Sequence, residues 1–364
     1  MSAIERLTDD SVAISFAVPP GLADVYAHTA GQHVAVVAPR LGDGVRRSYS
    51  ICTPAGSGVL RIGVKLLPGG GFSAYAANKL EVGDELEVLT PAGRFGPGDL
   101  DPGQARSYGL VAAGSGITPL LSIAATVLAE QPRSRVTLVY ANRTARSVMF
   151  AEEVADLKDR FGPRLQVLHV LSREPGGVDL LSGRLDQDRM GRLLDTLVPV
   201  DGVDAWYLCG PHALVSDLRD VLVGRGASAG AVRTELFHAD ESPPTAPPTA
   251  PPTELSPAQH ARTRPAGDTL ADRAEVEVLL DGRRSTLRVP ADGVPVLDAA
   301  LAVRDDTPFS CRGGVCGTCR AKLVEGTVRM DHSYALEPDE IADGFVLTCQ
   351  SHPTSDRVVL DFDV

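Results

Sequence analysis

SCRGGVCGTC, residues 310–319, is a glycine-rich loop that carries Cys311, Cys316 and Cys319, and Cys349 follows after 29 further residues. The spacing C-x4-C-x2-C, completed by a distant cysteine, is a ligand pattern of [2Fe–2S] clusters, which are held by four thiolates. Glycine lets the backbone N–H groups of such a loop approach a cluster and donate hydrogen bonds to its sulfur atoms. The sequence therefore predicts an iron–sulfur site at these four cysteines.

Two alternative roles for the four cysteines fit less well. Buried structural thiols have no reason to share a glycine-rich loop at this spacing. A zinc site usually uses paired C-x2-C knuckles, whereas Cys349 stands alone. Of the two remaining cysteines, Cys52 is most simply interpreted as a small core hydrophobe.

Length and composition limit the class of protein. A chain of 364 residues exceeds one ordinary core and predicts two or three domains. The sequence shows no apolar run long enough to span a bilayer and no signal-like N-terminus, so we expect a cytoplasmic protein. Six cysteines in that compartment are more plausibly ligands and buried thiols than disulfides. The net charge of −12 argues against nucleic acids and anionic membranes as partners.

A proline-rich repeat marks the clearest boundary. Residues 243–253 read PPTAPPTAPPT, without core-forming side chains, and predict an extended polyproline II spacer. We therefore expect a linker over 239–269, followed by a cluster-bearing domain over 270–364. That domain carries 17 acidic and 10 basic residues. An acidic face that steers a basic partner is one interpretation, and an ordinary solvated surface is the other.

The region before the linker changes character near residue 103. Residues 1–102 contain short strand-like segments separated by Gly, Pro and Asp, which predict a small antiparallel β-barrel. Residues 103–238 contain apolar strands that alternate with helical stretches, which predict an α/β domain with a parallel sheet. The expected strands are 12–16, 33–37, 60–64 and 85–89 in the first domain and 109–113, 136–140, 165–170 and 204–208 in the second.

Two polar motifs in the first domain point to a flavin. In Arg47-Ser48-Tyr49-Ser50, the Arg can pair with a pyrophosphate, the Tyr offers a ring face and the Ser a hydroxyl. About twenty residues later, GGGFS at 69–73 can open a helix whose amides hold phosphate. A surface strand and a glycine turn are the ordinary alternatives. Together the motifs resemble the FAD site of the ferredoxin–NADP reductase superfamily, which implies that FAD is bound by Arg47, Ser48, Tyr49, Ser50, Gly70, Gly71, Phe72 and Ser73.

The second domain carries a candidate dinucleotide loop. GSGITP, residues 114–119, follows an expected strand and precedes a helical stretch over 120–130, so a helix N-terminus can receive phosphates. It resembles the pyridine-nucleotide loop of the same superfamily, which implies roles for Gly114, Ser115, Gly116 and Thr118. By the same resemblance, Cys209-Gly210-Pro211 lies beside the nicotinamide, Phe237 lies near the isoalloxazine, and Ser50 and Cys209 are the candidate catalytic residues. A structural strand-end cysteine and a packing aromatic are the alternatives.

The choice between NADPH and NADH depends on the ribose 2′ position. NAD-selective loops place an Asp or Glu after the second strand. Here Arg143 follows that strand, and Ser172 and Arg173 follow the next. The arginines can pair with a 2′-phosphate, so the sequence favours NADPH, although NADH stays possible and solvated surface arginines are an alternative.

The order of flavin, nicotinamide and ferredoxin domains covers nearly the whole chain. It matches the superfamily members that have a C-terminal plant-type [2Fe–2S] domain of β-grasp fold. The stretches 46–52, 334–341 and 344–350 further resemble the reductase subunits of phenylacetyl-CoA epoxidases, which supply electrons to a di-iron oxygenase. The resemblance implies an electron path from NADPH through FAD and the cluster to that oxygenase, with Cys311 and Cys316 on one iron and Cys319 and Cys349 on the other.

Two other functions stay open. The first is a reductase of another oxygenase, such as a ring-hydroxylating dioxygenase or a steroid hydroxylase, because cofactor motifs do not encode the acceptor. The second is a non-catalytic electron-transfer or redox-sensing module. No residue resembles an acid–base catalyst for a carbon substrate, so the ring chemistry is expected to belong to the partner.

Overall fold

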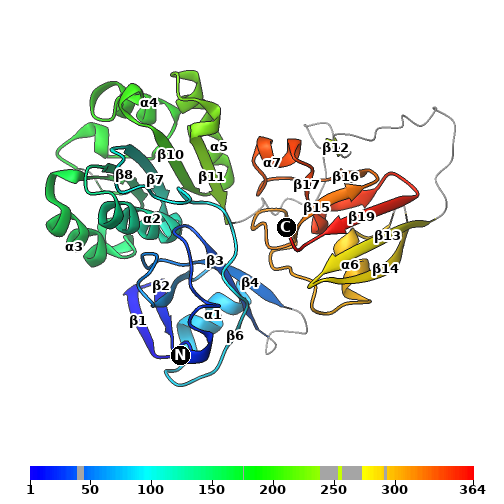
Figure 1. Cartoon of the computed structure of the whole chain (residues 1–364). Coiled ribbons are helices and arrows are strands. Elements are labelled where there is room, and N and C mark those ends of the chain that lie inside the picture. The colour runs from blue at the N-terminus through cyan, green and yellow to red at the C-terminus, as the bar shows by residue number, and fades with distance from the viewer. Residues whose placement is uncertain (39–44, 175, 238–252, 256–272, 291–292) are drawn as a thin grey trace. The chain divides into compact units, whose positions relative to one another are not determined.

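A computed structural model describes residues 1–38, 45–174, 176–237, 253–255, 273–290 and 293–364. The chain forms two compact units, Met1–Phe237 and His238–Val364 (Figure 1). The first unit contains two small antiparallel sheets and one parallel sheet, and the second contains a mixed sheet and a small antiparallel sheet. These architectures confirm the three predicted fold classes. The exact domain boundaries stay predictions.

The antiparallel part of the first unit is built from short strands with apolar inner faces. Its two sheets, ordered β1-β2-β5 and β4-β3-β6, are joined by a bridge between Ile51 and Ile62. Helix α1 (Gly71–Asn78) packs against β5 and buries Phe72. The strands are β1 Ala3–Thr8, β2 Ser11–Phe16, β3 His33–Val37, β4 Arg46–Ser50, β5 Leu60–Lys65 and β6 Glu87–Val88. Sequence reasoning missed β1, and the strand expected over 85–89 keeps only two paired residues.

The parallel sheet has the order β11-β10-β7-β8-β9 and is covered on both faces (Figure 1). Helix α2 packs against α3, and α4 packs against α5. Strands buried between two helical layers explain the apolar runs in this part of the sequence. The elements are β7 Ser107–Ala113, α2 Ile117–Glu130, β8 Arg135–Asn142, α3 Ala151–Phe161, β9 Leu165–Leu171, α4 Gln187–Thr196, β10 Ala205–Gly210, α5 His212–Gly224 and β11 Val232–Leu236.

The strand order creates a topological switch point between β7 and β10. From β7 the chain moves first to β8 on one side and later to β10 on the other. In open α/β sheets, ligands bind outside the carboxyl ends of strands at such a point. Gly114 follows β7 directly and Gly210 ends β10, so two of the predicted nucleotide segments meet at this place.

The second unit is a mixed sheet with the order β14-β13-β19-β15-β17 and a short helix, α6 (Val296–Leu301), packed on it. The strands of this sheet are β13 Arg273–Leu280, β14 Arg283–Pro290, β15 Arg320–Glu325, β17 Phe345–Leu347 and β19 Arg357–Asp361. The small sheet contains β12 Thr253–Leu255, β16 Val328–Met330 and β18 Ser351–Pro353, and α7 spans Pro338–Ala342. Leu297, Val346 and Val358 are among the fully buried residues in the core of the second unit.

Most of the predicted linker lies outside the described residues, including the repeat over 243–252. Thr253, the last residue of that repeat, begins β12 and pairs with Met330 of β16. The end of the repeat therefore contributes backbone to the sheet of the second unit. Among the described helices, none is both long enough and apolar enough to cross a membrane.

Candidate active site and iron–sulfur site

The two halves of the predicted flavin site lie together in the structure. In strand β4, Arg47 is exposed and Ser50 is buried. The ring of Tyr49 lies 5.4 Å from the ring of Phe72 on helix α1, measured between centroids. Burial raises the pKa of Tyr49 well above its usual value, so the phenol stays neutral. The R-x-Y-S strand and the GGGFS segment are thus in contact.

The GGGFS loop is shaped by one side chain. The Ser73 hydroxyl donates to the Gly70 carbonyl oxygen (3.2 Å) and accepts from the Leu67 N–H (3.1 Å). Gly69 has φ +72°, which favours glycine. Ser73 therefore holds the loop, and its direct contact with a phosphate stays a prediction.

The donor set of this surface fits a pyrophosphate. The first N–H groups of α1 have no partner within the helix, because the residues four positions before them lie outside it. The exposed guanidinium of Arg47 supplies the positive charge that a pyrophosphate prefers. Arg47, Gly71 and Phe72 are therefore the residues that would hold the phosphates of FAD.

The nucleotide loop packs directly on the end of β10. A Cβ on Gly116 would lie 2.0 Å from the Cys209 carbonyl oxygen, so only glycine permits this approach. Gly114 has φ +55°, and the Thr118 hydroxyl donates to the Ser115 carbonyl oxygen (3.1 Å). The predicted loop 114–118 and the predicted segment 209–211 are therefore neighbours.

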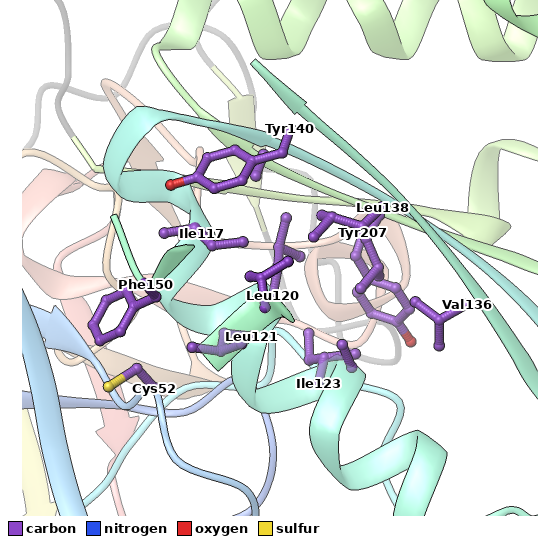
Figure 2. Close-up of a cluster of buried hydrophobic side chains, with 14 of the residues drawn as sticks. Cys52, Ile117, Leu120, Leu121, Ile123, Val136, Leu138, Tyr140, Phe150 and Tyr207 are labelled. Carbon is purple, nitrogen blue, oxygen red and sulfur yellow. The ribbon is translucent and has the colours of Figure 1, made fainter. Parts of the chain in front are cut away.

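Tyr140 is a loop-holding residue that sequence reasoning missed. Its hydroxyl lies 3.2 Å from the Gly114 carbonyl oxygen and 3.1 Å from the Met149 carbonyl oxygen, and can donate to either. The side chain is fully buried, near Ile117 (Figure 2). Burial raises the pKa of Tyr140 well above its usual value, so the hydroxyl remains a donor.

Glu235 connects the two candidate catalytic residues. The Ser50 hydroxyl donates to Glu235 Oε2 at 2.9 Å, and the Cys209 thiol lies 3.8 Å from the same oxygen. Strands β10 and β11 pair in parallel with Cys209 opposite Glu235, which fixes the second contact. Strand β4, which carries the flavin motif and is called the flavin strand below, and strand β10, which ends in the predicted nicotinamide segment, therefore both contact the Glu235 carboxylate. Sequence reasoning gave Glu235 no role, because the register of β11 is not visible in the sequence.

Cys209 is a neutral thiol in this arrangement. It is 1% exposed, and burial, helped by the charge of Glu235, raises its pKa well above the usual value. Phe237 is partly buried against the same hydrophobic core. Its predicted place near the isoalloxazine, like that of Pro211 near the nicotinamide, stays a prediction.

The residues predicted to read the ribose 2′ position lie at neighbouring strand ends. The Ser172 N–H donates to the Asn142 carbonyl oxygen (2.9 Å), and the Arg173 N–H donates to the Arg143 carbonyl oxygen (2.8 Å). Both arginine side chains are exposed. Within the described ranges, neither guanidinium group has a hydrogen-bond or ion-pair partner. Two exposed arginines on hydrogen-bonded neighbouring segments suit a phosphate dianion, and their contact with a 2′-phosphate stays a prediction.

The four cluster cysteines gather in the second unit as two thiol pairs. A hydrogen bond between Cys311 and Cys316 raises the pKa of Cys311, and one between Cys319 and Cys349 raises the pKa of Cys319. Among the described residues, no three or more His, Cys, Asp or Glu side chains converge on a single metal ion. A binuclear cluster held by four thiolates takes two of them on each iron. The assignment of Cys311 and Cys316 to one iron and of Cys319 and Cys349 to the other, which the resemblance implies, stays a prediction.

One backbone N–H and one side-chain amide donate hydrogen bonds to these sulfur atoms. The Gly313 N–H donates to Cys311 Sγ at 3.4 Å, and Gln350 Nε2 lies 3.7 Å from Cys349 Sγ. Gly314 and Gly317 have φ values of +75° and +68°, which turn the loop. Gln350, which also donates to the Arg312 carbonyl oxygen (2.8 Å), is a further supporting residue that sequence reasoning missed.

Three family models match the chain in the order of these sites. The oxidoreductase FAD-binding domain matches residues 1–96, and the oxidoreductase NAD-binding domain matches residues 110–220. The 2Fe-2S iron-sulfur cluster binding domain matches residues 278–354. The three matched ranges contain the candidate FAD, nucleotide and cluster residues except Phe237, which lies outside them.

Individual proteins resemble the chain over its whole length. The E subunit of 1,2-phenylacetyl-CoA epoxidase from Escherichia coli K12 is 39% identical over 360 residues, which cover 99% of this chain and 96% of that protein. The ferredoxin reductase component of 3-ketosteroid-9-alpha-monooxygenase from Rhodococcus rhodochrous is 33% identical and covers 100% of this chain and 95% of its own length. Among solved structures, an intact type IV self-sufficient cytochrome P450 monooxygenase matches 99% of this chain and 40% of its own with a TM-score of 0.67 and 26% identity.

Proposed function

The chain belongs to the ferredoxin–NADP reductase superfamily, among the oxygenase reductases with a C-terminal [2Fe–2S] domain, and we propose that it carries electrons from NADPH to the di-iron oxygenase of a phenylacetyl-CoA epoxidase. The similarity to the E subunit of that epoxidase over 99% of the chain carries the choice of acceptor. The cofactor sites alone do not distinguish between oxygenases.

The cofactors supply the electron chemistry. A nicotinamide gives up two electrons together and a [2Fe–2S] cluster accepts one, so a flavin between them, when bound, converts the pair into single electrons. In this proposal the protein binds and orients these groups. Arg47 and the N-terminus of α1 hold the FAD, the 114–118 loop holds the dinucleotide, and the four cysteines hold the cluster.

Ser50, Cys209 and Glu235 form the contact between the flavin and nicotinamide sides. Glu235 accepts the hydrogen bond of the Ser50 hydroxyl and orients it. The neutral Cys209 thiol packs there without acting as a nucleophile, because only the thiolate is strongly nucleophilic. In this proposal the Ser50 hydroxyl is held in one orientation at the site of hydride transfer, and the buried Cys209 side chain contributes packing only.

NADPH preference rests on Arg143 and Arg173, whose exposed side chains suit a 2′-phosphate. A cytoplasmic location is part of the proposal because none of the six cysteines forms a disulfide, as expected in a reducing compartment.

Reconstitution tests the acceptor. The holoprotein is combined with the oxygenase subunits of a phenylacetyl-CoA epoxidase, of a 3-ketosteroid 9α-monooxygenase or of a glycine betaine monooxygenase, and NADPH-driven product formation is measured. We expect the epoxidase to give the highest coupled turnover. Higher turnover with the steroid oxygenase would support the second candidate, which the 33% identical relative favours. Failure to oxidise NADPH with ferricyanide would favour a non-catalytic module.

A further inference from the structure

The flavin side and the nucleotide side of the first unit meet at Gly63. This residue lies in the middle of β5 and pairs with Ala13 of β2. A Cβ at this position would lie 2.7 Å from Thr118 Cγ2 and 2.8 Å from Phe150 Cε2. Gly63 does not have a positive φ, so the backbone does not require glycine here. What excludes a side chain is the close approach of Thr118 and Phe150.

Phe150 is held in this position by several contacts. It is 1% exposed and has φ +55°, a left-handed conformation that a bulky residue rarely adopts. Such a conformation persists only where the surroundings enforce it. The Arg61 guanidinium lies 5.2 Å from the centre of the Phe150 ring and pairs with Glu153 of α3 at 2.8 Å. Figure 2 shows the ring beside Cys52 in the buried cluster.

The same region is tied to the nucleotide loop on two sides. The Tyr140 hydroxyl lies within hydrogen-bond distance of the carbonyl oxygens of both Gly114 and Met149, the residue before Phe150, so it packs between the two segments and can donate to either. Thr118, which touches the Gly63 position, donates to Ser115. A displacement of Phe150 or Thr118 therefore moves the loop.

Helix α2 is also pinned to the chain that continues from the flavin strand. The Ser122 hydroxyl donates to the Thr53 carbonyl oxygen (2.7 Å), and the Thr126 hydroxyl accepts from the Ala55 N–H (3.0 Å). Ser122 and Thr126 lie one turn apart on one face of α2. Thr53 lies three residues after Ser50. The loop and the flavin strand thus have little freedom to separate, and Gly63 limits how closely they approach.

From these contacts we propose that Phe150, packed on Gly63, is a positioning residue that sets the distance between the nucleotide loop and the flavin strand, and so the distance over which hydride is transferred. Phe150 acts through the loop, by way of Met149, Tyr140 and Gly114. The inference rests on the proposed function, because it concerns hydride transfer from NADPH to flavin.

The test compares Gly63→Ala with Gly21→Ala in the holoprotein. Gly21 is a matched control, since a Cβ there would meet no heavy atom within 4 Å. A misplacement of about 1 Å can cost on the order of hundredfold in rate. We therefore expect Gly63→Ala to slow flavin reduction by NADPH, in stopped flow, on the order of tenfold to hundredfold. The dissociation constant of adenosine 2′,5′-bisphosphate should change less than about twofold, because the proposed 2′-phosphate site is at Arg143 and Arg173, away from Gly63.

A second readout does not depend on activity. Amide hydrogen exchange over 114–118 should be faster in Gly63→Ala than in wild type and unchanged in Gly21→Ala. Phe150→Leu replaces the ring by a smaller side chain. Combined with Gly63→Ala, it should partly restore the wild-type rates of amide hydrogen exchange and of flavin reduction. The rescue is partial because Thr118 also contacts the added Cβ.

Several results would overturn the proposal. Equal behaviour of Gly63→Ala and Gly21→Ala would do so, as would no rescue by Phe150→Leu. Loss of FAD together with weaker adenosine bisphosphate binding would show a general structural defect instead of a positioning effect. If wild-type protein did not oxidise NADPH, the proposed function would fail, while the exchange measurement would still report whether Gly63 and Phe150 fix the loop.

Discussion

The Ser50 hydroxyl donates to Glu235 across 185 positions of sequence, at 2.9 Å. Ser50 ends the strand that carries the flavin motif, and Glu235 lies in the last strand of the parallel sheet. This bond ties β4 to β11, which pairs with β10 beside Cys209, and in the proposed function it lies where the two cofactors meet. Removing either partner should therefore affect electron entry more than cofactor binding.

We expect Ser50→Ala and Glu235→Gln each to slow flavin reduction by NADPH about tenfold, because a hydrogen bond to a charged group contributes roughly 1.5–3 kcal/mol. The double variant should be no slower than the slower single variant, since both remove one interaction. Stopped-flow absorbance of the flavin measures the rates. Additive effects would mean that the two residues act separately.

Cys316→Ser should remove or strongly perturb the visible iron–sulfur absorption and leave flavin reduction by NADPH nearly intact, because the two groups bind to separate units. Cys52→Ala is the matched control, since Cys52 is buried in the core of the first unit. Absorption spectra and iron content measure the result. An unchanged cluster spectrum in Cys316→Ser contradicts the ligand assignment.

Arg47→Ala should increase FAD loss on dilution. A charge-assisted bond of roughly 1.5–3 kcal/mol corresponds to about tenfold to hundredfold in the dissociation constant. Arg133→Ala, which removes another exposed arginine, should have no such effect. Flavin fluorescence after gel filtration gives the comparison. Wild-type FAD affinity in Arg47→Ala would exclude the pyrophosphate role.

Arg173→Ala should raise KM for NADPH about tenfold or more and change KM for NADH little, because only NADPH has a 2′-phosphate. Steady-state kinetics with both nucleotides measures the ratio. Equal effects on the two nucleotides would show that Arg173 does not contact that phosphate.

The two cysteines outside the cluster should resist alkylation. Burial raises the pKa of Cys52 to about 12 and that of Cys209 well above its usual value. Only the thiolate reacts, so at about pH 8 both thiols stay protonated when folded, whereas unfolded thiols with a pKa of about 8.5 are partly ionised. Iodoacetamide labelling followed by mass spectrometry should be at least about a hundredfold slower in the holoprotein than in guanidinium chloride. Similar rates in both states contradict this prediction.

The sequence contained most of the local information and little of the long-range register. Spacing and glycine pattern were sufficient for the cluster loop, because three of its ligands lie within ten residues. The sequence predicted that the two motifs belong to one flavin site, but not that the rings of Tyr49 and Phe72 contact each other. Glu235 gained its role through the register of β10 and β11, which tertiary pairing sets. Tyr140 looked like a core strand residue, and its hydroxyl contacts depend on how two loops meet.

The linker shows the same limit. Residues 243–253 share one repeat, and nothing in the repeat separates its last threonine from the others. Yet Thr253 pairs with Met330, 77 positions later, because β16, which pairs with β18 on one side, has backbone groups on its other side that β12 can pair with. Pairing with a distant edge is not encoded in local composition.

Anaerobic stopped flow of the wild-type holoprotein with NADPH tests the proposed path of electrons most directly. We predict that flavin absorbance decreases first and that iron–sulfur absorbance decreases afterwards, with the second phase absent in Cys316→Ser. Loss of cluster absorbance before flavin absorbance, or a cluster that NADPH does not reduce at all, would contradict that path.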